Sequence, residues 1–251
     1  YNTVVGDEAG TAITTGDENT FVGYAAGDAT TTGIQNTAVG QNALTTNTTG
    51  TINTALGVGA LQNATTADGN TAVGSGVQLF TTTGAGNTSV GRIALFYNTT
   101  GASNVAIGKE ALFNNTTADN NTAVGYQSLF ANTTGTLNTA VGKDAGLSVT
   151  TGGANTLIGG LAGDAQTTAA NSTAVGYAAL GANTTGSNNT AIGKEALDAN
   201  TTGSENVGVG VGALGGNTTA ANNVAVGVNA LLANTTGAYN TALGLSAGAA
   251  V

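Results

Sequence analysis

Few side chains of this chain could take part in acid–base or nucleophilic chemistry. Its 251 residues include no histidine and no cysteine, and only four lysine and arginine side chains. A nucleophilic hydroxyl needs a base beside it. The acid pairs Asp7-Glu8 and Asp17-Glu18 have the residue types of a glycoside hydrolase, but solvated charges in turns account for them better. We therefore expect no enzyme and no catalytic residues.

The remaining carboxylates do not form a pattern that would hold a metal ion. Asp28 and Asp164 are isolated in the sequence, whereas Ca²⁺ takes about six to eight oxygen ligands. A chain without cysteine has no thiolate ligands. We expect no metal site and no cofactor. Three lysine–acid dipeptides, Lys109-Glu110, Lys143-Asp144 and Lys194-Glu195, are expected on an exposed corner, where charge limits lateral aggregation.

These residues recur at a fixed spacing, because the whole chain is a 17-residue repeat without insertions or deletions. The unit reads N-T-A-V-G-x-x-A-L-x-x-N-T-T-G-x-x, and "position" below means a place in this unit. One repeat array therefore fills residues 1–251. Its units start at residues 2, 19, 36, 53, 70, 87, 104, 121, 138, 155, 172, 189, 206, 223 and 240.

The residues at the constant positions predict an all-β fold. Position 5 is always glycine, position 4 is always valine, isoleucine or leucine, and positions 13 and 14 are always threonine. Valine and threonine favour strands, while glycine and asparagine favour corners. Repeats built from helix pairs need about 33 residues or more. We predict a β-solenoid of about 15 coils with one 17-residue coil per repeat, in which "NTAV" and "NTT" lie in two strands.

The connection between these strands has two versions. Eight units carry leucine at position 9 and asparagine at position 12, for example Leu129 with Asn132. Other units, such as the one containing Gly146, have glycine at position 9 and lack that asparagine. We interpret the first version as a helical turn that the asparagine ends in a left-handed conformation, and the second as an earlier turn at glycine.

Stacked coils place equal positions above one another, so we expect axial ladders of like side chains. Glycine at position 5 makes the corner, position 4 fills the lumen, and position 3, which is mostly alanine, contacts a partner chain. A strand that is apolar on both faces is usually buried on both, which predicts a homo-oligomer, a trimer or a bundled fibre. The predicted structural residues are Asn36, Gly40, Thr48, Thr49, Asn121, Val124, Gly125, Thr133, Thr134, Asn189, Gly193, Thr201 and Thr202.

Charge and hydropathy exclude several classes of partner. The net charge is −9 and only 7% of residues are charged, which does not suit a protein that binds nucleic acid through basic residues. No apolar run approaches the roughly 18 residues of a membrane span, so we expect no membrane insertion. The lack of cysteine is compatible with an extracellular location. We also expect the chain to be a fragment of a longer fibre.

Two phrases of the sequence resemble known families. "NTAVG" and "ANTTGSNNTAIGKEAL" at residues 182–197 resemble the repeats of phage tail-fibre-type proteins and bacterial trimeric adhesins. They are also similar to the "AIG" repeats of trimeric autotransporter heads, whose period is shorter. The resemblance implies an extracellular shaft, on a virion or a cell surface, that gives reach and displays a tip domain. A receptor would then be bound by a tip outside this chain.

Two alternatives remain open. Ice-binding solenoids display flat, regular threonine arrays, and the threonines at positions 13 and 14 would form such a ladder. Because adjacent residues of a strand point to opposite faces, only one of these two columns can face outward, flanked by the asparagine at position 12. The second alternative is a generic self-assembling extracellular filament. Eight units also carry an "NTT" glycosylation sequon, including Asn47, Asn98 and Asn183, which turn and ladder chemistry explains without a glycan.

Overall fold

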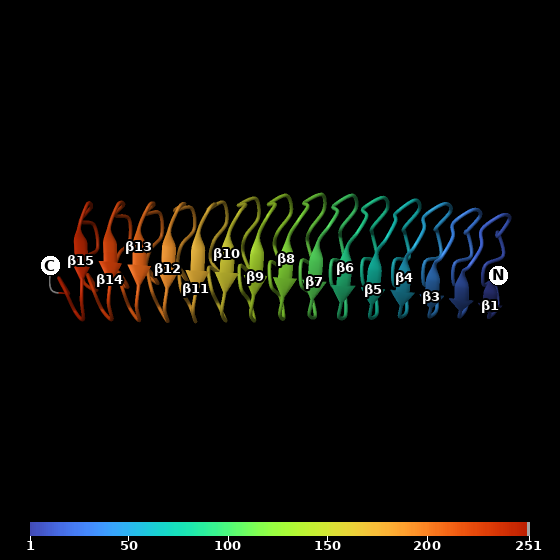
Figure 1. The fold of residues 1–251 in the computed structure, drawn as a ribbon, viewed down its shortest axis with the longest axis horizontal. Coiled ribbons are helices and arrows are strands. Elements are labelled where there is room, and N and C mark those ends of the chain that lie inside the picture. Colours follow the sequence, from blue (N-terminus) through green and yellow to red (C-terminus); the bar gives the residue numbers. More distant parts are fainter. Residues whose placement is uncertain (250–251) are drawn as a thin grey trace. The chain divides into compact units, whose positions relative to one another are not determined.

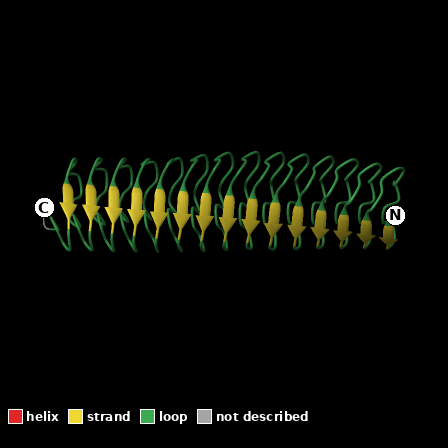
Figure 2. Ribbon diagram, in the orientation of Figure 1, coloured by secondary structure: helices red, strands yellow, loops and turns green. Residues whose placement is uncertain are grey.

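The computed structural model describes residues 1–249 and confirms an all-β fold, a parallel β-solenoid with one strand in each 17-residue coil. The chain divides into two compact units, Tyr1–Asn121 and Thr122–Val251. Within each unit the strands lie side by side in chain order (Figures 1 and 2). Each coil contributes three residues of strand, and the rest of the coil consists of turns.

The first unit contains seven strands that pair in parallel, each with the next in the sequence. They are β1 (Thr3–Val5), β2 (Thr20–Val22), β3 (Thr37–Val39), β4 (Thr54–Leu56), β5 (Thr71–Val73), β6 (Thr88–Val90) and β7 (Val105–Ile107). The pairing register equals the repeat: Thr3 lies opposite Thr20, and Thr20 lies opposite Thr37. Every column of the sheet therefore holds one repeat position.

The second unit continues the same pattern with eight strands. They are β8 (Thr122–Val124), β9 (Thr139–Val141), β10 (Thr156–Ile158), β11 (Thr173–Val175), β12 (Thr190–Ile192), β13 (Val207–Val209), β14 (Val224–Val226) and β15 (Thr241–Leu243). Thr156 lies opposite Thr173, and Thr173 lies opposite Thr190. The register does not shift at any described pair of this unit.

The expected orientation of the strand side chains was wrong, and the two faces are exchanged. Position 3 faces the lumen, where Ala38 and Ala140 are fully buried. Position 4 faces outward, where Val141 is 36% exposed and Ile192 is 41% exposed. Val124, which was expected to fill the lumen, likewise lies on the outward side of β8 and is only partly buried. Position 3 therefore cannot contact a partner chain.

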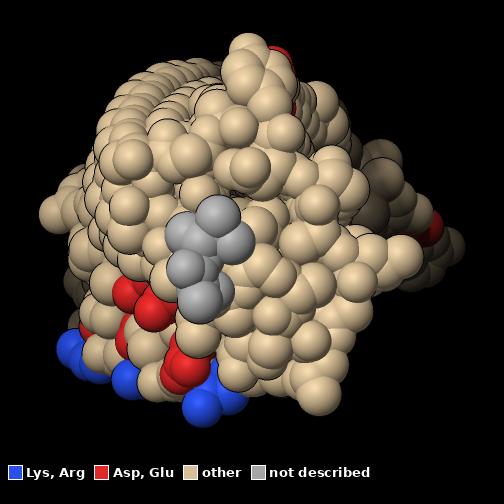
Figure 3. Space-filling model, turned by 90° about the vertical axis from the view of Figure 1, so that its left-hand side faces the viewer, with Lys and Arg blue, Asp and Glu red and all other residues tan. Residues whose placement is uncertain are grey.

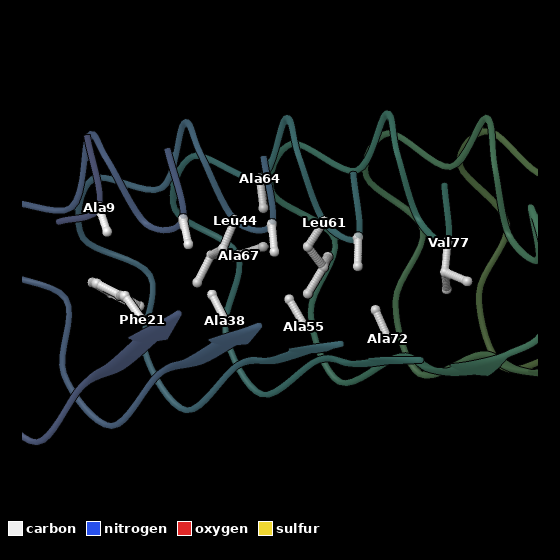
Figure 4. Packing of buried hydrophobic residues seen from close by; sticks show 13 residues of the cluster. Ala9, Phe21, Ala38, Leu44, Ala55, Leu61, Ala64, Ala67, Ala72 and Val77 are labelled. Atoms are coloured by element: carbon white, nitrogen blue, oxygen red, sulfur yellow. The ribbon is translucent and has the colours of Figure 1, made fainter. Parts of the chain in front are cut away.

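The width of the lumen explains why alanine dominates position 3. In Figure 4 the alanines of the strands point across the interior toward Leu44 and Leu61 at position 9. The largest residues at position 3 occur only in units that have glycine at position 9: the ring of Phe21 packs beside Gly27, and Leu157 packs beside Gly163. The two versions of the connection are thus two ways of filling the same volume, since interiors are close-packed.

The connection contains no helical turn in the described residues, so the expectation for the version with leucine at position 9 was wrong. Position 9 has a left-handed backbone in both versions, with φ of 51° at Leu129 and 62° at Gly146. Asn132 at position 12 does not adopt this conformation. Its buried side chain instead donates a hydrogen bond from Nδ2 to the carbonyl oxygen of Gly135 at 3.0 Å.

The "NTT" segment forms turns and not the second strand that was expected. Its backbone is still bonded along the coil axis, because the N–H of Thr99 donates to the carbonyl oxygen of Thr116 at 2.8 Å. The corner glycine is required by geometry: Gly125 has φ of +137°, and a Cβ there would collide with the carbonyl oxygen of Gly142. Gly40 and Gly193 have the same conformation, with φ of +136° and +135°.

Candidate functional site

The asparagine column at position 1 forms a buried hydrogen-bonded ladder. The Oδ1 atom of Asn19 accepts both the backbone N–H of Asn36 at 2.9 Å and its Nδ2–H at 3.2 Å. Nδ2 of Asn36 also donates to the carbonyl oxygen of Gly50 at 2.9 Å, which ties the start of the coil to its end. Asn121 repeats the first two contacts with Asn104, at 2.9 and 3.3 Å.

The threonine pair divides between two environments. The hydroxyl groups of Thr48, Thr133 and Thr201 at position 13 donate to the carbonyl oxygens of the next threonine 17 residues on, at 3.1, 3.1 and 3.0 Å. At position 14, Thr49, Thr134 and Thr202 are exposed to solvent. Position 13 therefore bonds coil to coil, while position 14 forms a single outward column.

The sequon asparagines at position 12 point inward, so they do not flank the outward threonines as expected. Asn47, Asn98 and Asn183 are fully buried. Where neighbouring coils both carry this residue, a second ladder forms: Nδ2 of Asn200 donates to Oδ1 of Asn183 and to the carbonyl oxygen of Gly203, both at 2.9 Å. A glycan on these amides would have no room in the folded chain.

The outward face of each strand carries a feature that the sequence analysis did not single out. Position 2 is threonine in 12 of the 15 units, with Val105, Val207 and Val224 as the exceptions. This position points to the same side as position 4, because alternate residues of a strand share a face. We call these two columns the threonine–valine face. The sequence signal for this face is a β-branched residue at position 2 followed two residues later by valine, isoleucine or leucine at position 4. It could be recognised only by assigning position 3 to the lumen.

The described strands that form this face carry no charged side chains on it, since none has a charged residue at position 2 or 4. Lys109, Lys143 and Lys194 at position 6 pair with the acid that follows each of them, at 3.1, 3.1 and 3.2 Å. Figure 3 shows the basic side chains in view gathered beside acidic ones at one edge, while most of the surface in view is uncharged.

An aromatic cluster lies on the connections of the first unit. Phe80 stacks on Tyr97 with centroids 5.4 Å apart, and Phe96 stacks on Phe113 at 5.3 Å. The two stacked pairs also contact each other edge to face, with ring centroids of Phe80 and Phe96 5.2 Å apart. Phe80 and Tyr97 are 39% and 43% exposed. Because ring faces cover one another along the axis, the cluster presents mainly ring edges to solvent.

Two carboxylates at position 10 are disfavoured in their ionised form. Burial is the main cause that raises the pKa of Asp164 and of Asp198, and the neighbouring Glu195 adds to it at Asp198. Both side chains flank Gly181 in the stack. Across the described residues, no group of three or more histidine, cysteine, aspartate or glutamate side chains is placed to hold a metal ion.

None of the described residues belongs to a helix long and apolar enough to cross a membrane. The acid pairs near the amino end lie on the exposed surface: Asp17 binds the terminal amino group, and this contact lowers its pKa. The fold thus brings together side-chain ladders and periodic faces. Among the described residues it does not place an acid, a base and a nucleophile together in one site.

Comparison with protein-family models, curated proteins and solved structures finds no match to this chain.

Proposed function

We propose that this chain is the structural shaft of an extracellular fibre, as in a phage tail fibre or a surface adhesin, and that it holds a tip domain away from a virion or cell. The observation that supports this proposal is the constant 17-residue register of the strands and buried ladders within each unit. Neighbouring coils within a unit are joined by recurring asparagine, threonine and strand contacts, with Ser172 in place of asparagine at one step, so each added repeat lengthens the array with the same kinds of bond.

The interior of the coil suits a mechanical role. The lumen is filled by small and medium side chains, and the buried asparagines bond along the axis at each step. A pull along the axis would be shared, at each interface between neighbouring coils, by the ladder hydrogen bonds and the strand-pair hydrogen bonds acting in parallel. Stability in such arrays is a sum of repeats and of interfaces between neighbours. Receptor recognition belongs, in this proposal, to a tip outside the chain.

Self-association into a trimer or a bundled fibre is part of the same proposal, although position 3 no longer supports it. The exposed aromatic edges of Phe80 and Tyr97 supply an anchor for such a contact, since aromatic side chains are enriched in protein interfaces.

Electron microscopy of deletion variants tests the shaft. Removing residues 138–171, which are two whole repeats, should give a folded particle shorter by about 10 Å, because stacked strands lie about 4.8 Å apart. Removing residues 138–147 breaks the register and should unfold or aggregate the chain. A wild-type particle that is no longer than it is wide would overturn the proposal, as would equal folding of both deletions.

A further inference from the structure

We propose that the threonine–valine face binds ice. This inference goes beyond the shaft function and does not depend on it. The face consists of positions 2 and 4 of successive strands, for example Thr156 and Ile158 of β10 beside Thr173 and Val175 of β11. The ligand is a crystal surface, so recognition requires a periodic array of groups and not a pocket.

The face is periodic in two directions. Across the sheet, columns repeat at the strand spacing of about 4.8 Å, and along a strand positions 2 and 4 are about 6.6 Å apart. These two repeats are of the same order as the spacings between rows of oxygen atoms on the side faces of hexagonal ice. The register is unshifted at every described pair within each unit, so the array does not drift from one coil to the next.

The chemistry of the face also suits ordered water. Threonine presents a hydroxyl and a methyl group, and the aliphatic column presents methyl groups, so water above them meets few strong competing charges. Where position 2 is not threonine it is valine, as in Val207, which has the same branched shape and keeps the surface regular. Ile158 and Ile192 at position 4 are 39% and 41% exposed.

The threonines at positions 13 and 14 do not provide such a lattice. At position 13 the hydroxyl groups are used within the fold, as in the bond from Thr184 Oγ1 to the carbonyl oxygen of Thr201 at 3.0 Å. Only the column at position 14 is exposed, and the asparagine at position 12 is buried beneath it. A single column matches a crystal in one direction, whereas the threonine–valine face matches it in two.

The supporting structure makes the face rigid. Position 3 is buried in the lumen in strands β2 to β14, a corner glycine follows position 4, and the asparagine ladder binds the backbone N–H of the residue before the strand, as at Asn36. A second copy of the chain is the competing occupant. The 12 threonines at position 2 argue against a dry protein contact, because buried hydroxyl groups need hydrogen-bond partners.

The test measures thermal hysteresis, ice-crystal shaping and partition into slowly growing ice with the full chain. T173Y places a bulky ring in the middle of the face, and T185Y makes the same change in the outward column at position 14. We expect wild type and T185Y to shape ice and to enter it, and T173Y to lose thermal hysteresis severalfold. Circular dichroism establishes that both variants fold.

A second matched pair, T37Y and T49Y, repeats the comparison in the other unit, so that a folding defect of T173Y does not decide the result. The inference is overturned if wild type neither shapes ice nor enters it, or if T185Y and T49Y lose activity while T173Y and T37Y keep it. It is also overturned if sedimentation shows that T173Y converts an oligomer to a monomer, because a second copy then covers the face. None of these results depends on the length of the particle, which is the quantity that tests the shaft function.

Discussion

Ser172 interrupts the asparagine ladder between Asn155 and Asn189. Its backbone N–H still donates to Oδ1 of Asn155 at 3.0 Å, but its hydroxyl accepts the N–H of Asn189 only at 3.4 Å. Elsewhere the same place holds an amide that donates to the preceding asparagine and to the carbonyl oxygen at position 15, as Asn53 does at 3.1 and 2.7 Å. The hydrogen bonding between neighbouring coils is therefore weaker at Ser172 than at an asparagine in the same position.

Replacing this serine should strengthen the stack. The substitution S172N restores a buried amide with partners on both sides, and a typical intramolecular hydrogen bond contributes about 1 kcal/mol. We expect the free energy of unfolding in urea to rise by roughly that amount. The converse substitution N53S, in an intact part of the ladder, should lower it. Equal or lower stability of S172N would show that the serine is accommodated without loss.

The inward orientation of position 3 is tested by a pair of neighbouring residues. Ala140 is fully buried and Val141 is 36% exposed. A140D places an unpaired charge in the lumen and should cost about 3–5 kcal/mol, whereas V141D should cost roughly 1 kcal/mol. Thermal unfolding of both variants gives the comparison. A larger loss for V141D would reverse the assignment of the two faces.

Leu197 combines full burial with an unfavourable backbone, because its φ is 53°. L197A should cost about 2–5 kcal/mol through the cavity it leaves. L197G removes the same contacts but relieves a left-handed conformation that costs a side chain about 1 kcal/mol. We therefore expect L197G to be the more stable of the two variants in chemical denaturation. The opposite order would mean that the backbone at this position is not strained.

The raised pKa of Asp198 predicts a pH-dependent stability difference. Burial, with a contribution from Glu195, raises its pKa in the folded chain, so the native state binds this proton more tightly than the unfolded state. Its contribution to stability is complete below the unfolded pKa of about 3.9 and is lost as pH rises through the folded pKa.

The substitution D198N removes this titration. The variant should be more stable than wild type at pH 7, and the difference should vanish near pH 3. Denaturant unfolding of both proteins at the two pH values measures it. A difference that is the same at both values would assign the effect to packing around Gly181 and not to the charge.

The sequence by itself determined the period, the parallel in-register stacking and the asparagine ladder. A repeat without insertions forces equal residues into columns, and glycine at position 5 forces a corner where a Cβ would meet the next coil, as at Gly40. These features follow from local geometry and stacking alone. The burial of the sequon asparagines, such as Asn183, does not follow from either.

Only the tertiary structure decided which face of each strand looks inward. Positions 3 and 4 are both apolar, so alternation along a strand could not choose between Ala140 and Val141. The choice rests on volume: the lumen must also hold Leu129 or its equivalent, and it admits a large residue at position 3 only where glycine faces it, as Phe21 faces Gly27. The pairing of a large residue at position 3 with glycine at position 9 is visible in the sequence. It can be interpreted only once the structure shows that both side chains point into the same interior.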